Sequence, residues 1–114
     1  MDRWIISELN ILIQEVDAAL EDFDSQIAGR ALARFIDDLS NWYVRRSRRR
    51  FWDGDTAALG TLHECLVTLT KLLAPLVPFI TEQVWQELVR PTDPSAQTSV
   101  HLANWPIAQS SAID

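Results

Sequence analysis

The chain has 114 residues, of which 47% are hydrophobic and 23% are charged, the size and composition of one globular domain with its own apolar core. The single cysteine, Cys65, excludes an intramolecular disulfide, so we expect a reducing compartment, the cytoplasm. The first residues do not form a secretory signal and no apolar stretch is long enough to span a bilayer, so no membrane partner is expected.

The formal net charge of −6 conceals an uneven distribution of charge. Five arginines lie between positions 45 and 50. Removing their five positive charges from the total of −6 leaves −11 for the rest of the chain. The sequence therefore predicts an acidic body that carries one concentrated basic site.

Two amphipathic helices are predicted in the first half of the chain, because apolar residues recur every three or four positions. The first runs from about residue 2 to 22, and its core stripe is predicted to contain Trp4 or Ile5, Leu9, Leu12, Ile13, Val16, Leu20 and Phe23. The second begins after a cap at Asp24 or Ser25 and runs to about Phe51. Its core stripe is predicted to contain Ile27, Ala31, Leu32, Phe35, Leu39 and Trp42.

Two further helices are predicted after the turn signal at residues 53–55, where Asp55 is a good N-cap. The third carries leucines at positions 59, 62, 66, 69, 72 and 73 and ends near Pro75, which lacks a backbone N–H. Pro78 suits the first turn of a fourth helix that runs to about Val89. Its apolar face is predicted to contain Ile80, Val84 and Leu88, with Trp85 beside them.

The predicted fold class is all-α, since the chain has three glycines and no strand-like alternation before residue 98. Four helices joined by short turns predict an up-and-down helical bundle of four main helices with a short irregular or extended C-terminal tail. We predict a single domain over 1–114, with a core at 2–90 and a loop and tail at 91–114.

The segment 41–52, NWYVRRSRRRFW, contains the strongest functional signal. Guanidinium groups stay charged and donate paired hydrogen bonds to phosphates, and neighbouring aromatic rings can stack on unpaired bases. On an α-helix, five residues of the second predicted helix fall within roughly 60° of one another and form a basic stripe beside the core stripe: Arg30, Arg34, Asn41, Arg45 and Arg48. The candidate residues for RNA binding or interdomain contact are Arg45, Arg46, Arg48, Arg49, Arg50, Asn41, Arg30, Arg34 and Trp52.

Structural roles are the alternative for several of these residues. Arg34 precedes Asp37 and Asp38 by three and four positions, the spacing of weak surface pairs. Trp42 fits the core stripe better than a stacking surface, and Arg46 projects in line with that stripe, so that its stem would cover the end of the core. The whole cluster could also form salt bridges with an acidic neighbour, including another domain of a longer protein.

No catalytic or metal site is predicted in this chain. His63 and Cys65 are two positions apart on a helix and point in nearly opposite directions, so they cannot form a nucleophile and base pair. The histidines and the cysteine lack the spacing of zinc ligands, and the three glycines are isolated. Cys65 is predicted to be a small buried apolar residue.

Four segments carry a family resemblance. They are DRWIISELN (2–10), DDLSNWYVRRSRRRFW (37–52), LLAPLVPFITEQVWQEL (72–88) and SVHLANWP (99–106). In this order they resemble the helical anticodon-binding domain of class I isoleucine–tRNA ligases. The first and third segments are shared with the valine, leucine and methionine enzymes, whereas the second and fourth together resemble the isoleucine type.

The resemblance implies a piece of a longer ATP-dependent ligase, whose partners are the anticodon stem-loop of isoleucine-accepting tRNA and the catalytic domain of the same longer chain. ATP and magnesium are implied for that longer protein, with zinc as a further candidate, and no cofactor for this chain. The signatures His-x-Gly-His and Lys-Met-Ser-Lys-Ser do not occur here, so the chain alone is not expected to activate an amino acid.

The implied task is to orient the tRNA for aminoacylation, with the arginines at 45, 46, 48, 49 and 50 in contact with phosphate or with another domain. The tail 99–106 is expected to lie across the bundle as a strap, with His101 part of that packing. An interaction module that docks an acidic protein through the arginines, without RNA, is the alternative function, and a free-standing enzyme is a third.

Overall fold

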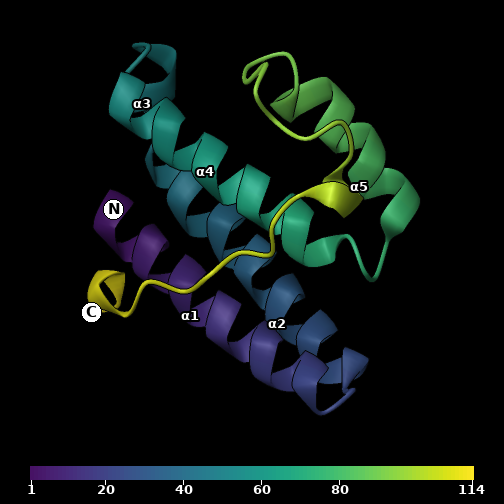
Figure 1. Ribbon diagram of the computed structural model, residues 1–114. Helices are drawn as coiled ribbons and strands as arrows, with labels where there is room; N and C mark the ends of the chain where they lie inside the picture. Colours follow the sequence, from purple (N-terminus) through teal and green to yellow (C-terminus); the bar gives the residue numbers. More distant parts are fainter. The chain divides into compact units, whose positions relative to one another are not determined.

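The computed structural model describes residues 1–114 and consists of helices and turns without a strand (Figure 1). The α-helices are α1 (Asp2–Glu21), α2 (Ser25–Asp38), α3 (Arg48–Trp52), α4 (Thr56–Leu73) and α5 (Pro78–Val84). Two π-helical segments continue α2 and α5, η1 (Leu39–Val44) and η2 (Trp85–Val89), and two 3₁₀ turns follow, η3 (Val100–Leu102) and η4 (Ser110–Ala112). The predicted all-α class with four main helical segments is confirmed. None of the helices is both long and apolar enough to cross a membrane.

The chain divides into two compact units. The first contains residues 1–65 and 107–114, and the second contains residues 66–106. Helix α4 contributes its first part to one unit and its last part to the other. The segment with the arginines belongs entirely to the first unit.

The predicted helix boundaries are confirmed at the caps. The side chain of Asp24 accepts a hydrogen bond of 3.0 Å from the backbone N–H of Ile27, at the start of α2. Asp55 accepts bonds of 2.9 and 3.2 Å from the N–H groups of residues 57 and 58, at the start of α4. Helix α4 ends at Leu73, two residues before Pro75, and α5 has Pro78 in its first turn. Asp24 and Asp55 thus accept hydrogen bonds from backbone N–H groups that have no partner within the first turn of a helix. Pro78 needs no such partner, because proline has no backbone N–H.

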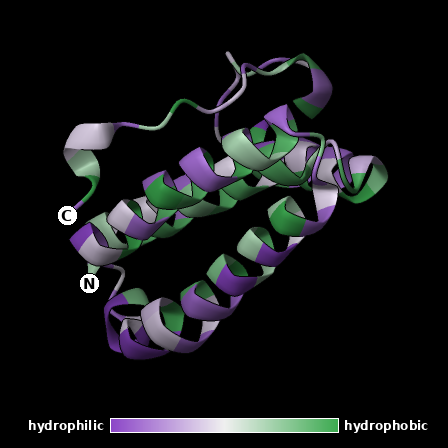
Figure 2. Cartoon of the chain, turned by 90° about the horizontal axis from the view of Figure 1, so that it is seen from below, coloured by the Kyte–Doolittle hydropathy of each residue, from purple (hydrophilic) through white to green (hydrophobic).

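The core of the first unit forms between α1 and α2, which run antiparallel and are joined by the turn at 22–24. Figure 2 shows hydrophobic and hydrophilic residues alternating within the turns of the long helices, as expected for helices with one apolar stripe. The buried residues confirm most of the predicted stripes: Ile5, Leu9, Leu12, Ile13, Val16, Ala31, Leu32, Phe35 and Leu39.

The predicted core positions beside the turn at 22–24 are wrong. Phe23 is 96% exposed and Ile27 is 53% exposed. Phe23 lies in a Schellman motif, in which the N–H of Asp24 bonds the carbonyl of Ala19 at 2.8 Å and the N–H of Phe23 bonds that of Leu20 at 3.0 Å. This motif gives Phe23 a φ of 55°, the left-handed conformation that favours glycine. The turn therefore directs the Phe23 side chain away from the apolar stripe.

The turn after α3 has the same hydrogen-bond pattern with a glycine in place of the phenylalanine. There, Gly54 has a φ of 71°, and the N–H of Asp55 bonds the carbonyl of Arg50 at 3.0 Å. The comparison predicts that Phe23→Gly raises the free energy of unfolding by about 1 kcal/mol, since the left-handed strain is relieved and no buried contact is lost. Urea denaturation measures the change.

Phe23→Ala is the matched control, because alanine also removes the ring but keeps the Cβ atom that causes the strain. We expect its stability to stay close to that of the original chain. Equal stabilities of the glycine and alanine variants would contradict the assignment of strain to position 23.

The second unit forms around Trp85, which is 3% exposed and lies in a cluster with Ala74, Val89 and Val100. Its indole N–H donates a hydrogen bond of 2.9 Å to the carbonyl of Gln97. Ile80 was predicted in the apolar face and is 66% exposed, so that prediction is wrong. The buried positions follow each other at every fourth residue, 81, 85 and 89, and the π-helical turns of η2 keep them in line.

The C-terminal tail makes two separate sets of contacts. In the second unit, the carboxylate of Glu82 accepts hydrogen bonds from the hydroxyl of Ser99 and, at 3.4 Å, from the N–H of Val100. His101 has its Nε2 3.7 Å from the same carboxylate. The segment SVHLANWP is thus held against α5, and it includes a 3₁₀ turn rather than a continuous extended piece.

In the first unit, residues 107–114 lie along α1. The buried side chains of Ser7 and Asn10 accept hydrogen bonds from the backbone N–H groups of Asp114, at 3.0 Å, and Gln109, at 2.8 Å. These two polar residues interrupt the apolar stripe of α1 because they hold the returning chain. The segment that lies on α1 thus begins directly after the predicted strap at 99–106.

Candidate functional site

The helix that carries the arginines changes its geometry before it reaches them. Residues 39–44 form a π-helical segment, with hydrogen bonds from i to i+5 in place of the α-helical i to i+4. The buried positions along it are Phe35, Leu39, Tyr43 and Ser47, a spacing of four. In an α-helix, residues four apart drift by about 40° around the axis, and the wider turns remove this drift. The apolar face of the second predicted helix, drawn for an α-helical rotation of 100° per residue, therefore does not extend beyond Leu39.

This change reverses the predicted roles of two neighbouring aromatic residues. Trp42 was predicted in the core and is 48% exposed, whereas Tyr43, one of the aromatic residues of the segment 41–52 that could in principle stack on bases, is fully buried. The ring of Tyr43 packs edge-on against Phe51, with 6.1 Å between centroids. Its hydroxyl donates a hydrogen bond of 2.8 Å to Asp2. Tyr43 therefore belongs to the core and Trp42 to the surface.

Arg46 also differs from the structural role predicted for it. Its guanidinium carbon lies 4.7 Å from the centre of the Trp42 ring, a cation–π contact. The small residue Ser47 occupies the buried position that would otherwise be the end of the apolar stripe. The stem of Arg46 therefore does not cover the core, and its charge remains at the surface.

Four arginines form what we call the arginine surface: Arg45, Arg46, Arg48 and Arg49. All four are exposed, and none takes part in an ion pair or a side-chain hydrogen bond within the chain. Together with Trp52 and Asp53 they line an open hollow of about 430 Å³. The positive charge of these groups is therefore available to a ligand.

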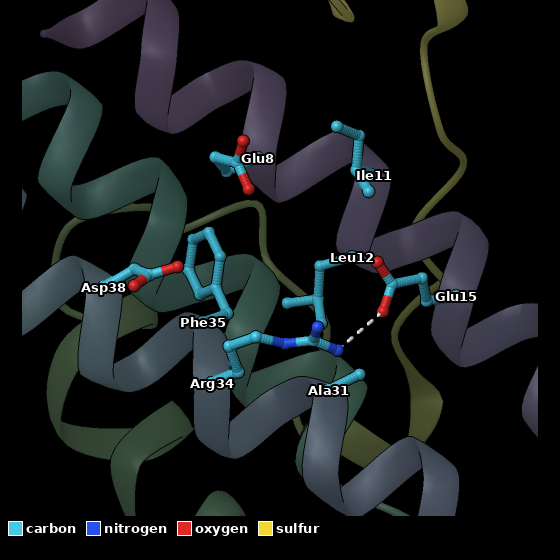
Figure 3. Close-up of a pocket in the computed structure, with 8 residues that line it drawn as sticks. All are labelled: Glu8, Ile11, Leu12, Glu15, Ala31, Arg34, Phe35 and Asp38. Atoms are coloured by element: carbon cyan, nitrogen blue, oxygen red, sulfur yellow. Dashed lines mark hydrogen bonds and ion pairs between the residues drawn. The ribbon is translucent and has the colours of Figure 1, made fainter.

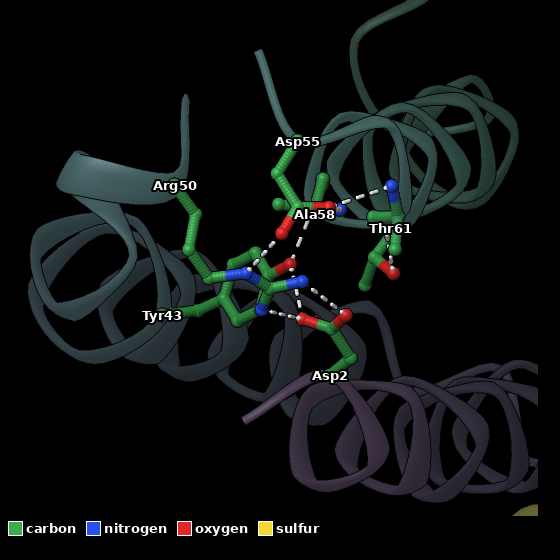
Figure 4. Close-up of polar contacts among 7 residues, drawn as sticks. Asp2, Tyr43, Arg50, Asp55, Ala58 and Thr61 are labelled. Carbon is green, nitrogen blue, oxygen red and sulfur yellow. Dashed lines mark hydrogen bonds and ion pairs between the residues drawn. The ribbon is translucent and has the colours of Figure 1, made fainter. Parts of the chain in front are cut away.

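Arg50 is the exception in the cluster, because each of the three nitrogens of its guanidinium bonds a carboxylate inside the unit (Figure 4). Its Nη1 and Nη2 bond the two carboxylate oxygens of Asp2 at 2.7 and 2.9 Å. Its Nε bonds the carboxylate of Asp55 at 3.0 Å. We call the group formed by Arg50, Asp2, Asp55 and Tyr43 the acid clamp. It joins the first turn of α1, the end of α3 and the start of α4.

The acid clamp shifts the pKa values of its members. The hydrogen bonds from Arg50 are the largest cause that lowers the pKa of Asp2 and of Asp55, and the two carboxylates raise the pKa of Arg50. Burial, followed by the hydrogen bond to Asp2, raises the pKa of Tyr43 to about 12. Every group is thus held in the state that these bonds require at neutral pH.

Of the remaining site candidates, Arg34 lies beside acidic residues of α1 and α2 (Figure 3). Arg34 pairs with Glu15 at 3.2 Å, rather than with Asp37 or Asp38. It lines a hollow of about 70 Å³ together with Glu8, Glu15 and Asp38. Three carboxylates and a volume that holds only a few water molecules do not suit a phosphate.

Asn41 and Arg30 have different surroundings. Asn41 donates a hydrogen bond of 2.7 Å to Asp37 and lines a second hollow of about 310 Å³, together with Trp42, Arg45 and Arg46. Arg30 is exposed on α2. The structure thus brings Asn41, but neither Arg30 nor Arg34, to the hollows beside the arginine surface.

The predicted burial of Cys65 is confirmed. Its side chain is inaccessible, and burial raises the pKa of its thiol to about 12, which leaves it protonated and unreactive at neutral pH. No group of three or more histidine, cysteine, aspartate or glutamate side chains is arranged to hold a metal ion.

Sequence reasoning missed the acid clamp. Asp55 was identified only as a helix cap, and Asp2 was assigned no role. One signal was present, since an acid in the first turn of one helix and an N-cap acid on another can both reach an arginine at the end of a third.

The clamp predicts a pH dependence of stability. Because the pKa values of Asp2 and Asp55 are lower in the folded than in the unfolded chain, their stabilisation is present above pH 4 or so and is lost as the pH falls through the folded values. Asp2→Asn removes one of these groups. We expect the variant to be less stable at pH 7 and to lose less of its remaining stability between pH 5 and pH 2, measured by urea denaturation.

Asp114→Asn is the control, because it removes an ion pair with Arg3 whose two side chains are 64% and 89% exposed, and exposed pairs contribute little. Its stability at pH 7 should match the original chain. If Asp2→Asn behaved in the same way, the clamp would not be the source of the pH dependence.

Known proteins match this chain over its whole length. Residues 2–114 match the family described as the anticodon-binding domain of tRNA ligase. Over its full length the chain is 64% identical to an isoleucine–tRNA ligase of Streptomyces avermitilis, 61% to one of Cutibacterium acnes and 48% to one of Thermus thermophilus. It spans 11%, 10% and 12% of the length of these relatives.

Proposed function

This chain belongs to the family of anticodon-binding domains of tRNA ligases, and we propose that it binds the anticodon stem-loop of isoleucine-accepting tRNA through the arginine surface. The observation that carries the proposal is the set of four exposed arginines that form no ion pair within the chain, in a chain whose net charge is −6. By holding the stem-loop, the domain orients the tRNA for ATP-dependent aminoacylation by the rest of a ligase.

Charge distribution supports a polyanion as the partner. Four like charges on neighbouring residues repel one another, and no carboxylate of the chain forms an ion pair with any of them. RNA phosphates supply the missing negative charge, and guanidinium groups match their geometry with paired hydrogen bonds. The acidic remainder of the chain repels RNA elsewhere, so it restricts binding to this surface and keeps the affinity of the isolated chain low.

The proposed roles differ among the site residues. Arg45, Arg48 and Arg49 contact phosphates, Asn41 and Arg46 line the same surface, and Arg50 holds the helix in place through the acid clamp. Arg34 is engaged by Glu15, so we assign to it, and to the nearby Arg30, at most a weak long-range attraction.

The proposal extends to the longer protein. We infer a cytoplasmic isoleucine–tRNA ligase in which ATP and magnesium serve the catalytic part and this chain is one domain. The catalytic domain of the same protein is then its second partner.

Alanine substitution of the arginines tests the proposal. We expect R45A/R48A/R49A to weaken binding of a hairpin with the isoleucine anticodon stem and loop. The slope of log K against log salt should become shallower by about 2, since three phosphate contacts are lost at about 0.7 each on a single strand. Fluorescence anisotropy at several salt concentrations measures both quantities.

Two control variants separate charge from geometry. R45K/R48K/R49K keeps the charge and should retain most of the salt slope, and Arg90→Ala removes an exposed arginine of the second unit and should change neither quantity. Binding unaffected by the triple alanine substitution would refute the RNA role. In that case, a pull-down with the catalytic domain tests whether the arginines dock an acidic protein instead.

A further inference from the structure

We propose that a hollow in the second unit binds the carboxylate side chain of an acidic peptide segment, and that this segment belongs to the part of the longer ligase outside residues 1–114. The inference rests on the longer protein proposed above and does not depend on RNA binding. It is carried by a positive charge that has no anionic partner, in a hollow that adjoins an exposed apolar run.

The hollow has a volume of about 170 Å³ and is lined by residues from the end of α4 and from the tail. We call it the Lys71 hollow. Its polar lining comes from Lys71, His101 and Asn104, and its apolar walls include Pro75 and Trp105. No aspartate or glutamate lines it. In a chain with 16 acidic residues and a net charge of −6, a cation without a neighbouring carboxylate makes this hollow attractive to an anion.

Two side chains of the hollow offer hydrogen-bond donors. Lys71, the single lysine of the chain, is half-buried and forms no ion pair. Its Nζ lies 5.9 Å from the centre of the Trp85 ring, at the outer limit of a cation–π contact. The carboxamide of Asn104 is exposed and makes no hydrogen bond within the chain. An ammonium and an amide N–H together suit the two oxygens of a carboxylate.

Glu82, the acid that holds the tail, does not supply the missing partner. Its carboxylate accepts hydrogen bonds from Ser99 and from the N–H of Val100, and the Nε2 of His101 lies 3.7 Å away. The charge of Glu82 is thus engaged by the tail, whereas the charge of Lys71 is left for a group from outside the chain.

The lining favours a carboxylate over a phosphate. Phosphates are bound with high specificity by guanidinium groups that donate paired hydrogen bonds, and the Lys71 hollow contains no arginine. One ammonium matches the single charge of a carboxylate. The apolar walls at Ala74, Pro75 and Trp105 suit the methylene groups of an aspartate or glutamate side chain.

The surface beside the hollow favours a protein as the source of the carboxylate. Pro75 lines the hollow and begins the apolar run PLVPFI at 75–80, in which every residue except Leu76 is exposed. Phe79 is 90% exposed and Ile80 is 66% exposed. Contiguous apolar side chains at a surface are typical of sites that another protein segment covers.

The length of the relatives supports a segment of the same protein. The chain spans 10% to 12% of each of them, so most of such a protein lies outside the matched part. A segment on the same polypeptide reaches an effective concentration in the millimolar range. A single carboxylate contact, too weak to join two separate proteins, is then sufficient.

Two peptides test the hollow. One is a blocked tripeptide with glutamate between two leucines, and the other has glutamine in place of the glutamate. NMR spectra of the labelled chain follow the side-chain amide of Asn104 and the indole N–H of Trp105. We expect saturable shifts with the glutamate peptide at millimolar concentrations and binding of the glutamine peptide that is weaker by about tenfold or more.

Substitutions separate the charge from the apolar contact. Lys71→Met keeps an apolar stem of similar length and should weaken binding of the glutamate peptide by about tenfold or more, whereas Lys71→Arg should retain most of it. Phe79→Ala should weaken it by about 2- to 5-fold. The matched control is Arg90→Met, which removes an exposed cation of the same unit that does not line the hollow, and it should bind like the original chain. Thermal unfolding checks that each variant folds.

Equal binding of the two peptides, or shifts with inorganic phosphate but not with the glutamate peptide, would overturn the carboxylate site. None of these measurements contains RNA. The hairpin titration of R45A/R48A/R49A therefore decides the proposed RNA role separately, and either proposal can fail while the other stands.

Acetylation of Lys71 tests the source of the segment. The isolated chain and the longer ligase that contains it are treated with an acetylating reagent, and mass spectrometry measures the rate at position 71. We expect the rate to be lower by about tenfold or more in the longer protein, because an ammonium held by a carboxylate does not react. Equal rates would show that no segment of the same protein occupies the hollow and would overturn this part of the inference.

Discussion

The position of α3 in the first unit depends on one ion-paired group, in which Arg50 bridges Asp2 and Asp55. A guanidinium with all three of its nitrogens engaged has a fixed orientation, and here its partners come from the first turn of α1 and the N-cap of α4. The short helix α3 has no buried residue of its own. The acid clamp is therefore a main restraint that fixes where α3, and with it the outward-facing arginines, can lie.

Because of this restraint, Arg50 has a different role from the other four arginines of the cluster. Six positions contain five chemically identical side chains, yet one is engaged by two carboxylates and four have no anionic partner. Elsewhere in the unit, arginines pair with acids at the surface, as Arg34 does with Glu15 and Arg3 with Asp114. Apart from Arg30, the arginines of the unit that lack an ion pair are thus concentrated in one place.

Much of the fold could be predicted from local sequence patterns. Apolar periodicity placed the four main helical segments, and the side chains of Asp24, Asp55 and Pro78 placed their starts, because these signals act within one turn of helix. The motifs at 2–10, 37–52, 72–88 and 99–106 gave the family, which the comparisons confirm. The segment that carries the arginines is largely helical, as predicted, and its contacts with a ligand remain predictions to be tested.

The remainder could not be predicted because it depends on distant residues or on non-standard helical turns. A period of 3.6 residues put Trp42 inside and left Tyr43 outside, whereas the π-helical segment does the opposite. The prediction that Phe23 is buried was wrong because a Schellman turn, not apolarity, decides its position. The bond between Arg50 and Asp2 joins residues 48 positions apart, and the Ser7 and Asn10 bonds to the tail span even more of the chain. No spacing rule reports such pairs.

The π-helical segment η1 has a consequence for how this surface could change in evolution. The wider turns of this segment accommodate about one more residue than an α-helix with the same total rotation. Loss of a single residue between positions 39 and 44 would therefore allow an ordinary α-helix that leaves the guanidinium groups facing the same direction. Conversion of all six residues to α-helix without that loss would instead rotate the whole basic face by about 100°, without the replacement of any arginine.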